Sequence, residues 1–78
     1  PNPFNDAVRI GFKVEKAGEV RLELFDIQGR KILSEAESFP SGSGDYVIDG
    51  DRLGGAGVYL LRIGMNGGWR TLKLIYMP

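Results

Sequence analysis

The sequence predicts an all-β protein, an immunoglobulin-like antiparallel β-sandwich of six or seven strands. Three observations predict this class. Apolar residues alternate with polar ones at a period of two, turn residues interrupt the alternation, and no 3.6-residue period persists for even two helical turns. Short strands separated by turns about every eight to twelve residues are typical of a sandwich or a barrel. The twelve glycines further disfavour helices.

The first two predicted strands alternate cleanly. Residues 7–14 place four large apolar side chains on one face, namely Val8, Ile10, Phe12 and Val14. After a turn at residues 15–18, the second strand contributes Val20, Leu22 and Leu24 in the same way. The run Asp26-Ile27-Gln28-Gly29 ends it, and we expect Gly29 to supply the positive φ that closes a tight hairpin.

The next two predicted strands are weaker. Residues 30–37 form the third, with Ile32 and Leu33 as its only large apolar residues. Residues 39–44 are predicted to be a loop, because Pro40 excludes a central strand there. The fourth strand starts at Tyr46 and Ile48 and ends at residues 49–51.

The last two predicted strands form a hairpin. Residues 58–63 are apolar on both faces apart from Arg62, which indicates a central strand. Residues 66–68, Asn-Gly-Gly, are a strong hairpin turn, and the final strand covers residues 69–76. Leu53 is expected to plug the core from a glycine-rich loop. The predicted core is Val8, Ile10, Phe12, Leu22, Leu24, Ile48, Tyr59, Leu61, Leu72 and Leu74.

Composition excludes several classes of function. The chain has no cysteine and no histidine, so the thiolate and imidazole groups of many metal and catalytic sites are missing. Ten Lys and Arg balance ten Asp and Glu along the chain, which disfavours a basic nucleic-acid-binding patch. No apolar run approaches the ~20 residues needed to span a bilayer, and no signal peptide stands at the start. We expect one domain, residues 1–78, cut from the end of a longer protein.

The remaining candidates for chemistry are weak. Asp49 and Asp51 flank Gly50 and could present oxygens to Ca²⁺, but Asp-Gly pairs are ordinary turn residues. Glu35 and Glu37 share a strand face, which is typical of a solvated surface. The glycine-rich runs at 41–44 and 53–57 lack the following helix of a phosphate loop. We therefore predict no catalytic residue, no metal site and no cofactor.

A set of short motifs resembles the type A C-terminal sorting domain of the bacterial type IX secretion system. The chain opens Pro-Asn-Pro-Phe-Asn and continues with Ile10-Gly11-Phe12. A V-x-L-x-L-F-D strand then leads to Gly29-Arg30. The Ser41-Gly42 loop precedes a strand ending in Asp49-Gly50, and Leu53 and Gly57-Val58-Tyr59 follow. A terminal strand carries Lys73-Leu74-Ile75. The resemblance covers essentially the whole chain and is partly shared by the immunoglobulin-like domain of flagellar hook-capping proteins.

The resemblance implies a non-catalytic signal at the C-terminus of a larger secreted protein. Its parent domains would lie on the N-terminal side and pass through the periplasm and outer membrane to the cell surface or medium. The outer-membrane translocon would recognise the domain, and a sortase-like protease would remove it for surface attachment. A folded tag can be recognised by β-strand addition. The implied motif positions are Pro1, Asn2, Pro3, Phe4, Gly29, Gly57, Val58, Tyr59 and Lys73, with Lys73 as the direct recognition contact.

Two other functions fit the same residues. An immunoglobulin-like spacer between domains needs only the fold. A carbohydrate-binding accessory module of a secreted enzyme would expose coplanar aromatic side chains, for which Tyr46, Tyr59 and Trp69 are the candidates.

Overall fold

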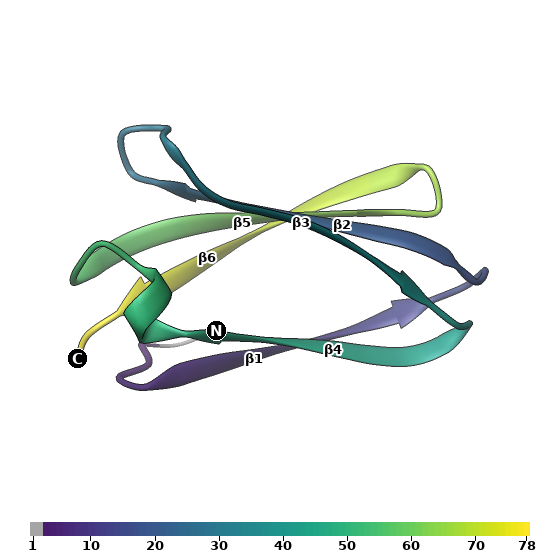
Figure 1. The fold of residues 1–78 in the computed structure, drawn as a ribbon, viewed down its shortest axis with the longest axis horizontal. Coiled ribbons are helices and arrows are strands. Elements are labelled where there is room, and N and C mark those ends of the chain that lie inside the picture. Colours follow the sequence, from purple (N-terminus) through teal and green to yellow (C-terminus); the bar gives the residue numbers. More distant parts are fainter. Residues whose placement is uncertain (1–2) are drawn as a thin grey trace.

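A computed structural model describes residues 3–78 and shows a sandwich of two antiparallel sheets (Figure 1). The strands and one short 3₁₀ helix, η1, occur in this order: β1 Ala7–Val14, β2 Gly18–Asp26, β3 Lys31–Phe39, β4 Gly42–Asp49, η1 Gly50–Arg52, β5 Gly57–Met65 and β6 Gly68–Tyr76. The larger sheet has the order β3-β2-β5-β6, and the smaller one consists of β1 and β4. The predicted β-sandwich is confirmed, with six strands.

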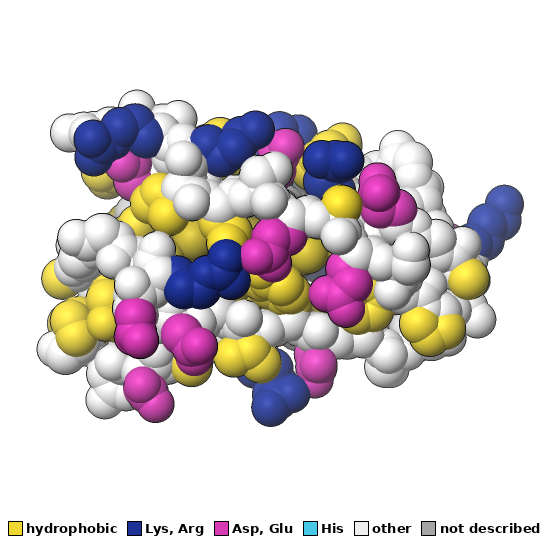
Figure 2. Space-filling model, viewed as in Figure 1, with side chains coloured by type: hydrophobic (Ala, Val, Ile, Leu, Met, Phe, Trp, Pro, Cys, Tyr) yellow, Lys and Arg dark blue, Asp and Glu magenta, His cyan; other side chains and the backbone are white. Residues whose placement is uncertain are grey.

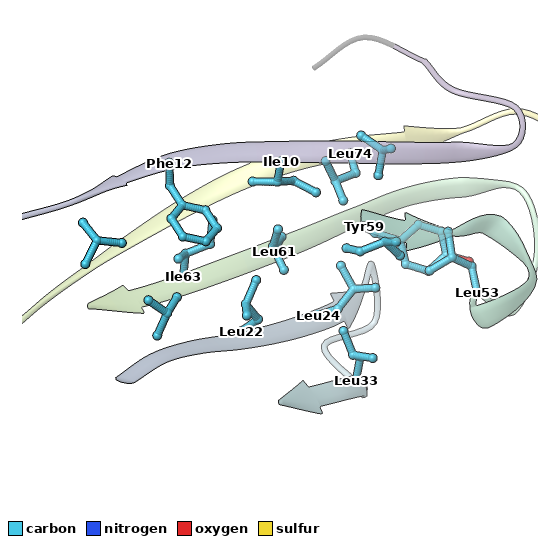
Figure 3. Packing of buried hydrophobic residues seen from close by; sticks show 14 residues of the cluster. Ile10, Phe12, Leu22, Leu24, Leu33, Leu53, Tyr59, Leu61, Ile63 and Leu74 are labelled. Atoms are coloured by element: carbon cyan, nitrogen blue, oxygen red, sulfur yellow. The ribbon is translucent and has the colours of Figure 1, made fainter. Parts of the chain in front are cut away.

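The core lies between the two sheets (Figure 3). Nine of the ten residues predicted for it are buried, and Leu53 closes one end of it as expected. The prediction for Leu72 is wrong, because this side chain is only partly buried. Leu72 faces inward from β6, the last strand of the larger sheet, and a two-stranded sheet cannot cover the whole inner face of a four-stranded one.

Two hairpin turns follow the predicted geometry. Gly29 has φ 86° and closes the turn between β2 and β3. Asn66 and Gly67, with φ 49° and 81°, connect β5 to β6 as the two-residue turn that matches the natural twist of a hairpin. β5 lies between β2 and β6, which confirms residues 58–63 as part of a central strand.

The predicted loop at residues 39–44 is too long. β3 continues to Phe39 and β4 begins at Gly42, so only Pro40 and Ser41 separate them. Gly44 lies within β4. Phe12 and Phe39 pack edge to face above it, with ring centroids 5.1 Å apart, and leave no room for a side chain at this position. A Cβ at Gly44 would come within 2.7 Å of Phe12. Glycine here permits close packing of two rings and does not mark a loop.

Candidate functional site

The first described motif residues pair with the end of the chain. Phe4 and Tyr76 form a parallel bridge in which the Phe4 amide donates to the Ile75 carbonyl at 2.9 Å. The Met77 amide donates in turn to the Phe4 carbonyl at 2.8 Å. The two aromatic rings pack with centroids 5.3 Å apart. Pro3 is exposed beside this bridge, whereas Pro1 and Asn2 lie outside the described residues.

The Asp49-Gly50 motif meets the same bridge. The ring of Tyr76 covers Gly50 so closely that a Cβ there would lie 2.5 Å from it. The Gly50 amide donates to the Asp6 carbonyl at 2.7 Å, which fixes η1 against the start of the chain. We call Phe4, Gly50 and Tyr76 together the terminal clasp. It joins the two ends of the described chain at one end of the sandwich (Figure 1).

The Gly57-Val58-Tyr59 motif adjoins the terminal clasp. Gly57, with φ 144°, pairs with Tyr76 and has a backbone conformation that other residues rarely adopt. Val58 pairs with Ile75 and is partly buried. Tyr59 is buried and its hydroxyl donates to the Gly55 carbonyl at 2.6 Å, so it anchors the glycine-rich loop to the core.

Asp26 stabilises the hairpin at Gly29. One carboxylate oxygen accepts the backbone amides of Gln28 and Arg30, both at 2.9 Å, and the other accepts the Arg30 guanidinium at 2.7 Å. These bonds, led by the Arg30 amide, lower the pKa of Asp26 below its ordinary value of 3.8. Asp26 also pairs with Tyr59, which places this hairpin at the same end of the sandwich. Sequence reasoning found Gly29 but not the carboxylate that fixes its turn.

An open groove of about 580 Å³ lies beside these motifs. The β2–β3 hairpin forms one wall, and the loop from Arg52 to Tyr59 forms the other. Both arginines at its rim are already paired, Arg30 with Asp26 and Arg52 with Glu35 at 2.8 Å. The groove therefore offers few free charges to a ligand.

Lys73 does not join the other motif positions. It lies on β6 opposite Leu60 and faces away from the core, on the outer face of the larger sheet. Leu60 is 42% exposed, so an apolar surface adjoins the lysine. Among residues 3–78, Lys73 has no ion-pair partner. Its side chain is therefore exposed beside an apolar surface on the outer face of the larger sheet.

The same outer face carries a network that the sequence did not reveal. The Arg62 guanidinium lies 4.2 Å from the centre of the Trp69 ring and 3.4 Å from the Glu23 carboxylate. Trp69 also covers Gly64, where a Cβ would approach the ring to 2.9 Å. The three candidate aromatics for sugar binding are not together, since Tyr46 lies on β4, Tyr59 is buried and Trp69 lies on β6. Figure 2 shows acidic and basic side chains intermixed on the face that it draws.

Glu35 links the two sheets at the opposite edge. Tyr46 of β4 donates its hydroxyl to the Glu35 carboxylate, and Arg52 of η1 pairs with the same group. These two partners, Tyr46 first, lower the pKa of Glu35 below its ordinary value of 4.5. Burial and then the Glu35 bond raise the pKa of Tyr46 above 10.0. Glu35 therefore keeps the solvent exposure expected of it, with 40% of its side chain exposed, and in addition links β3 to β4.

Within residues 3–78, no three His, Cys, Asp or Glu side chains gather closely enough to hold a metal ion. Over the same residues no helix is both long and apolar enough to cross a bilayer.

Comparison with known proteins adds one finding. Residues 1–77 match the family described as the secretion system C-terminal sorting domain. No curated protein and no solved structure gave a significant match.

Proposed function

The chain belongs to the family of secretion-system C-terminal sorting domains, and on this premise we propose that the outer-membrane translocon of the type IX secretion system recognises it. The observation that carries the proposal is the family match over residues 1–77, nearly the whole chain. The domain is thus a secretion signal, and its parent is secreted or exposed at the cell surface. A sortase-like protease that then separates domain and parent is part of the same proposal.

The geometry supports a signal that is recognised in its folded form. Motifs from both ends of the sequence meet in the terminal clasp, so they stabilise one another only when the chain is folded. Phe4 lies at the clasp, and parent domains on its N-terminal side join the sandwich at that end. Lys73 and Leu60 remain on the outer face. We propose Lys73 as the contact through which the translocon binds this face.

A reporter fusion tests this function. The 78 residues are placed at the C-terminus of a periplasmic reporter in a host with the type IX machinery, and whole-cell protease treatment measures surface exposure. The unmodified fusion should reach the surface. Lys73→Glu should slow export, because a reversed charge at a contact discriminates against binding. Lys16→Glu makes the same charge change at an exposed turn and should leave export unchanged.

The outcomes separate the functions. If the unmodified fusion stays in the periplasm of a secretion-competent host, the sorting function fails and the spacer takes its place. If Lys73→Glu is exported as well as Lys16→Glu, the sorting function stands and the proposed contact is wrong. Circular dichroism of the purified variants confirms that both are folded, since exposed substitutions usually change stability by about 0.5 kcal/mol or less.

A further inference from the structure

Among residues 3–78, the free edge of β6 carries backbone groups that no other strand pairs. The Ile75 carbonyl and the Met77 amide bond to Phe4, so the groups of these residues point away from β5. Backbone groups alternate in direction along a strand, and those of Thr71 and Lys73 therefore point to the same free side. Phe4 occupies only the last part of this edge. The Thr71 amide and carbonyl and the Lys73 amide have no backbone partner among residues 3–78.

The sandwich is open beside the same edge. A groove of about 560 Å³ lies between the end of β1 and the start of β6. Val14, Ile63 and Met65 supply apolar lining, and Leu72, farther along β6, is only partly buried. On the opposite β3–β4 side, Tyr46 and Arg52 bind Glu35 across the gap between the sheets. β6 is thus the edge at which an added strand would bury apolar surface.

The charge around this edge is mostly positive. Lys13 and Arg70 line the groove, and Lys73 lies farther along β6. None of the three forms an ion pair among residues 3–78. Glu15 is the one acidic residue that lines the groove. An incoming strand with carboxylates opposite Arg70 and Lys73 would match these charges.

We propose that the free edge of β6 binds an extended, acidic-apolar segment of a partner protein as a seventh strand. The strand runs antiparallel to β6, which is the more stable pairing. It places an apolar side chain opposite Leu72, carboxylates opposite Arg70 and Lys73, and its backbone against Thr71 and Lys73. That the partner belongs to the sorting machinery rests on the proposed function, but the binding itself does not.

Synthetic peptides test the proposal on the purified chain. The probe is a capped peptide, Thr-Glu-Leu-Thr-Glu-Val-Thr, added at millimolar concentration. Its matched control has lysine at both glutamate positions. Amide hydrogen exchange followed by NMR should slow at Thr71 and Lys73 with the glutamate peptide, because both amides become donors in a new ladder. The lysine peptide should bind at least about fivefold more weakly, since it places like charges opposite one another.

Paired variants locate the binding. Thr71→Pro removes the amide that points to the free edge, and edge strands tolerate proline at such a position. Thr71→Val keeps the amide and the β-branched shape. We expect Thr71→Pro to lower peptide affinity about five- to tenfold relative to Thr71→Val. Arg70→Glu should weaken binding of the glutamate peptide, whereas Lys31→Glu on the opposite edge strand should not.

Three results would overturn the proposal: no slowing of exchange at Thr71 and Lys73, equal binding of the two peptides, or equal affinity of the two Thr71 variants. Melting curves establish that each variant is folded. The reporter fusion separates this proposal from the sorting function. An exported fusion whose purified domain fails to bind the peptide refutes the β6 site alone, and peptide binding by a domain that is not exported refutes the sorting function alone.

Discussion

Asn66 shows how one side chain can join turns that are distant in sequence. Its Oδ1 accepts the amides of Glu15 at 3.1 Å and Lys16 at 3.5 Å, and its Nδ2 donates to the Lys16 carbonyl at 3.0 Å. The β5–β6 turn is thereby tied to the β1–β2 turn at the end opposite the terminal clasp. An Asn-Gly pair predicts the turn, but nothing local in the sequence predicts these three bonds.

Replacing Asn66 with glycine isolates those bonds. Glycine adopts φ 49° without strain, so the turn itself should survive. We expect Asn66→Gly to lower the free energy of unfolding by about 1–2 kcal/mol, measured by urea denaturation. Asn66→Asp keeps the acceptor oxygen and should therefore lower the free energy of unfolding by less than Asn66→Gly does. Equal stability of Asn66→Gly and the unmodified chain would show that the bonds contribute nothing.

Asp26 and Glu35 make the free energy of unfolding depend on pH in the acidic range. Both carboxyls have a pKa lowered in the folded chain, so their contribution is fully present above their ordinary values of 3.8 and 4.5. It is lost as the pH falls through the lower folded values. The double variant Asp26→Asn, Glu35→Gln should be less stable near pH 7 and should show a flatter fall below pH 4.5, measured by thermal melting across pH. An equally steep fall in the double variant would assign the acid sensitivity to other groups.

At the scale of elements, the close approach of side chains from distant segments explains two glycines that sequence patterns cannot explain. Gly29 and Gly67 have positive φ in turns, and their neighbours make that predictable. Gly44 and Gly50 instead leave room for Phe12 and Tyr76, which come from distant parts of the chain. Such a requirement appears only when the strands are assembled.

A substitution at Gly50 tests the terminal clasp. A Cβ there would displace the Tyr76 ring, so Gly50→Ala should cost about 1–3 kcal/mol and speed hydrogen exchange at the Phe4 and Met77 amides. Gly54→Ala is the matched control, because a Cβ at Gly54 meets no atom within 4 Å. If the two variants have the same melting temperature, the Tyr76 ring does not constrain position 50.

The Phe12 side chain of β1 packs against Phe39 of β3, which belongs to the other sheet. It is 8% exposed and packs edge to face against Phe39. Phe12→Ala should cost about 3–5 kcal/mol and leave a domain of this size barely folded. A variant that melts within a few degrees of the unmodified chain would show that the β1 register is wrong.

The sequence predicts strands better than it predicts their partners. Alternation located β1, β2 and β6 and the apolar residues of their inner faces, since burial of one face produces that pattern directly. It placed Leu72 in the core because alternation cannot show which strand lies at an edge. It also missed the groups that meet through tertiary structure, such as Glu35 with Tyr46 and Arg62 with Trp69. For the site, motif order identified the family, but only the fold separates Lys73 on the surface from the motif residues that build the clasp.

At the scale of the whole molecule, the two sheets differ in size, and this difference explains which part of the larger sheet is left exposed. Two strands cover four, a groove lies between β1 and β6, and Glu35 links the two sheets on the other side. The terminal clasp holds the first and last described segments together at one end of the sandwich. The motif residues that build the clasp and the exposed residues of β6 therefore lie on separate parts of the molecule.

We propose that the folded sandwich, and not its linear sequence, is the sorting signal. Surface exposure of the reporter fusion carrying Phe12→Ala tests this most directly, with Gly54→Ala as the folded control and immunoblotting to count only intact fusions. We expect Gly54→Ala to be exported like the unmodified fusion. We expect Phe12→Ala to accumulate in the periplasm in proportion to its unfolded fraction. An unfolded Phe12→Ala fusion that reaches the surface as efficiently as the control would contradict the claim.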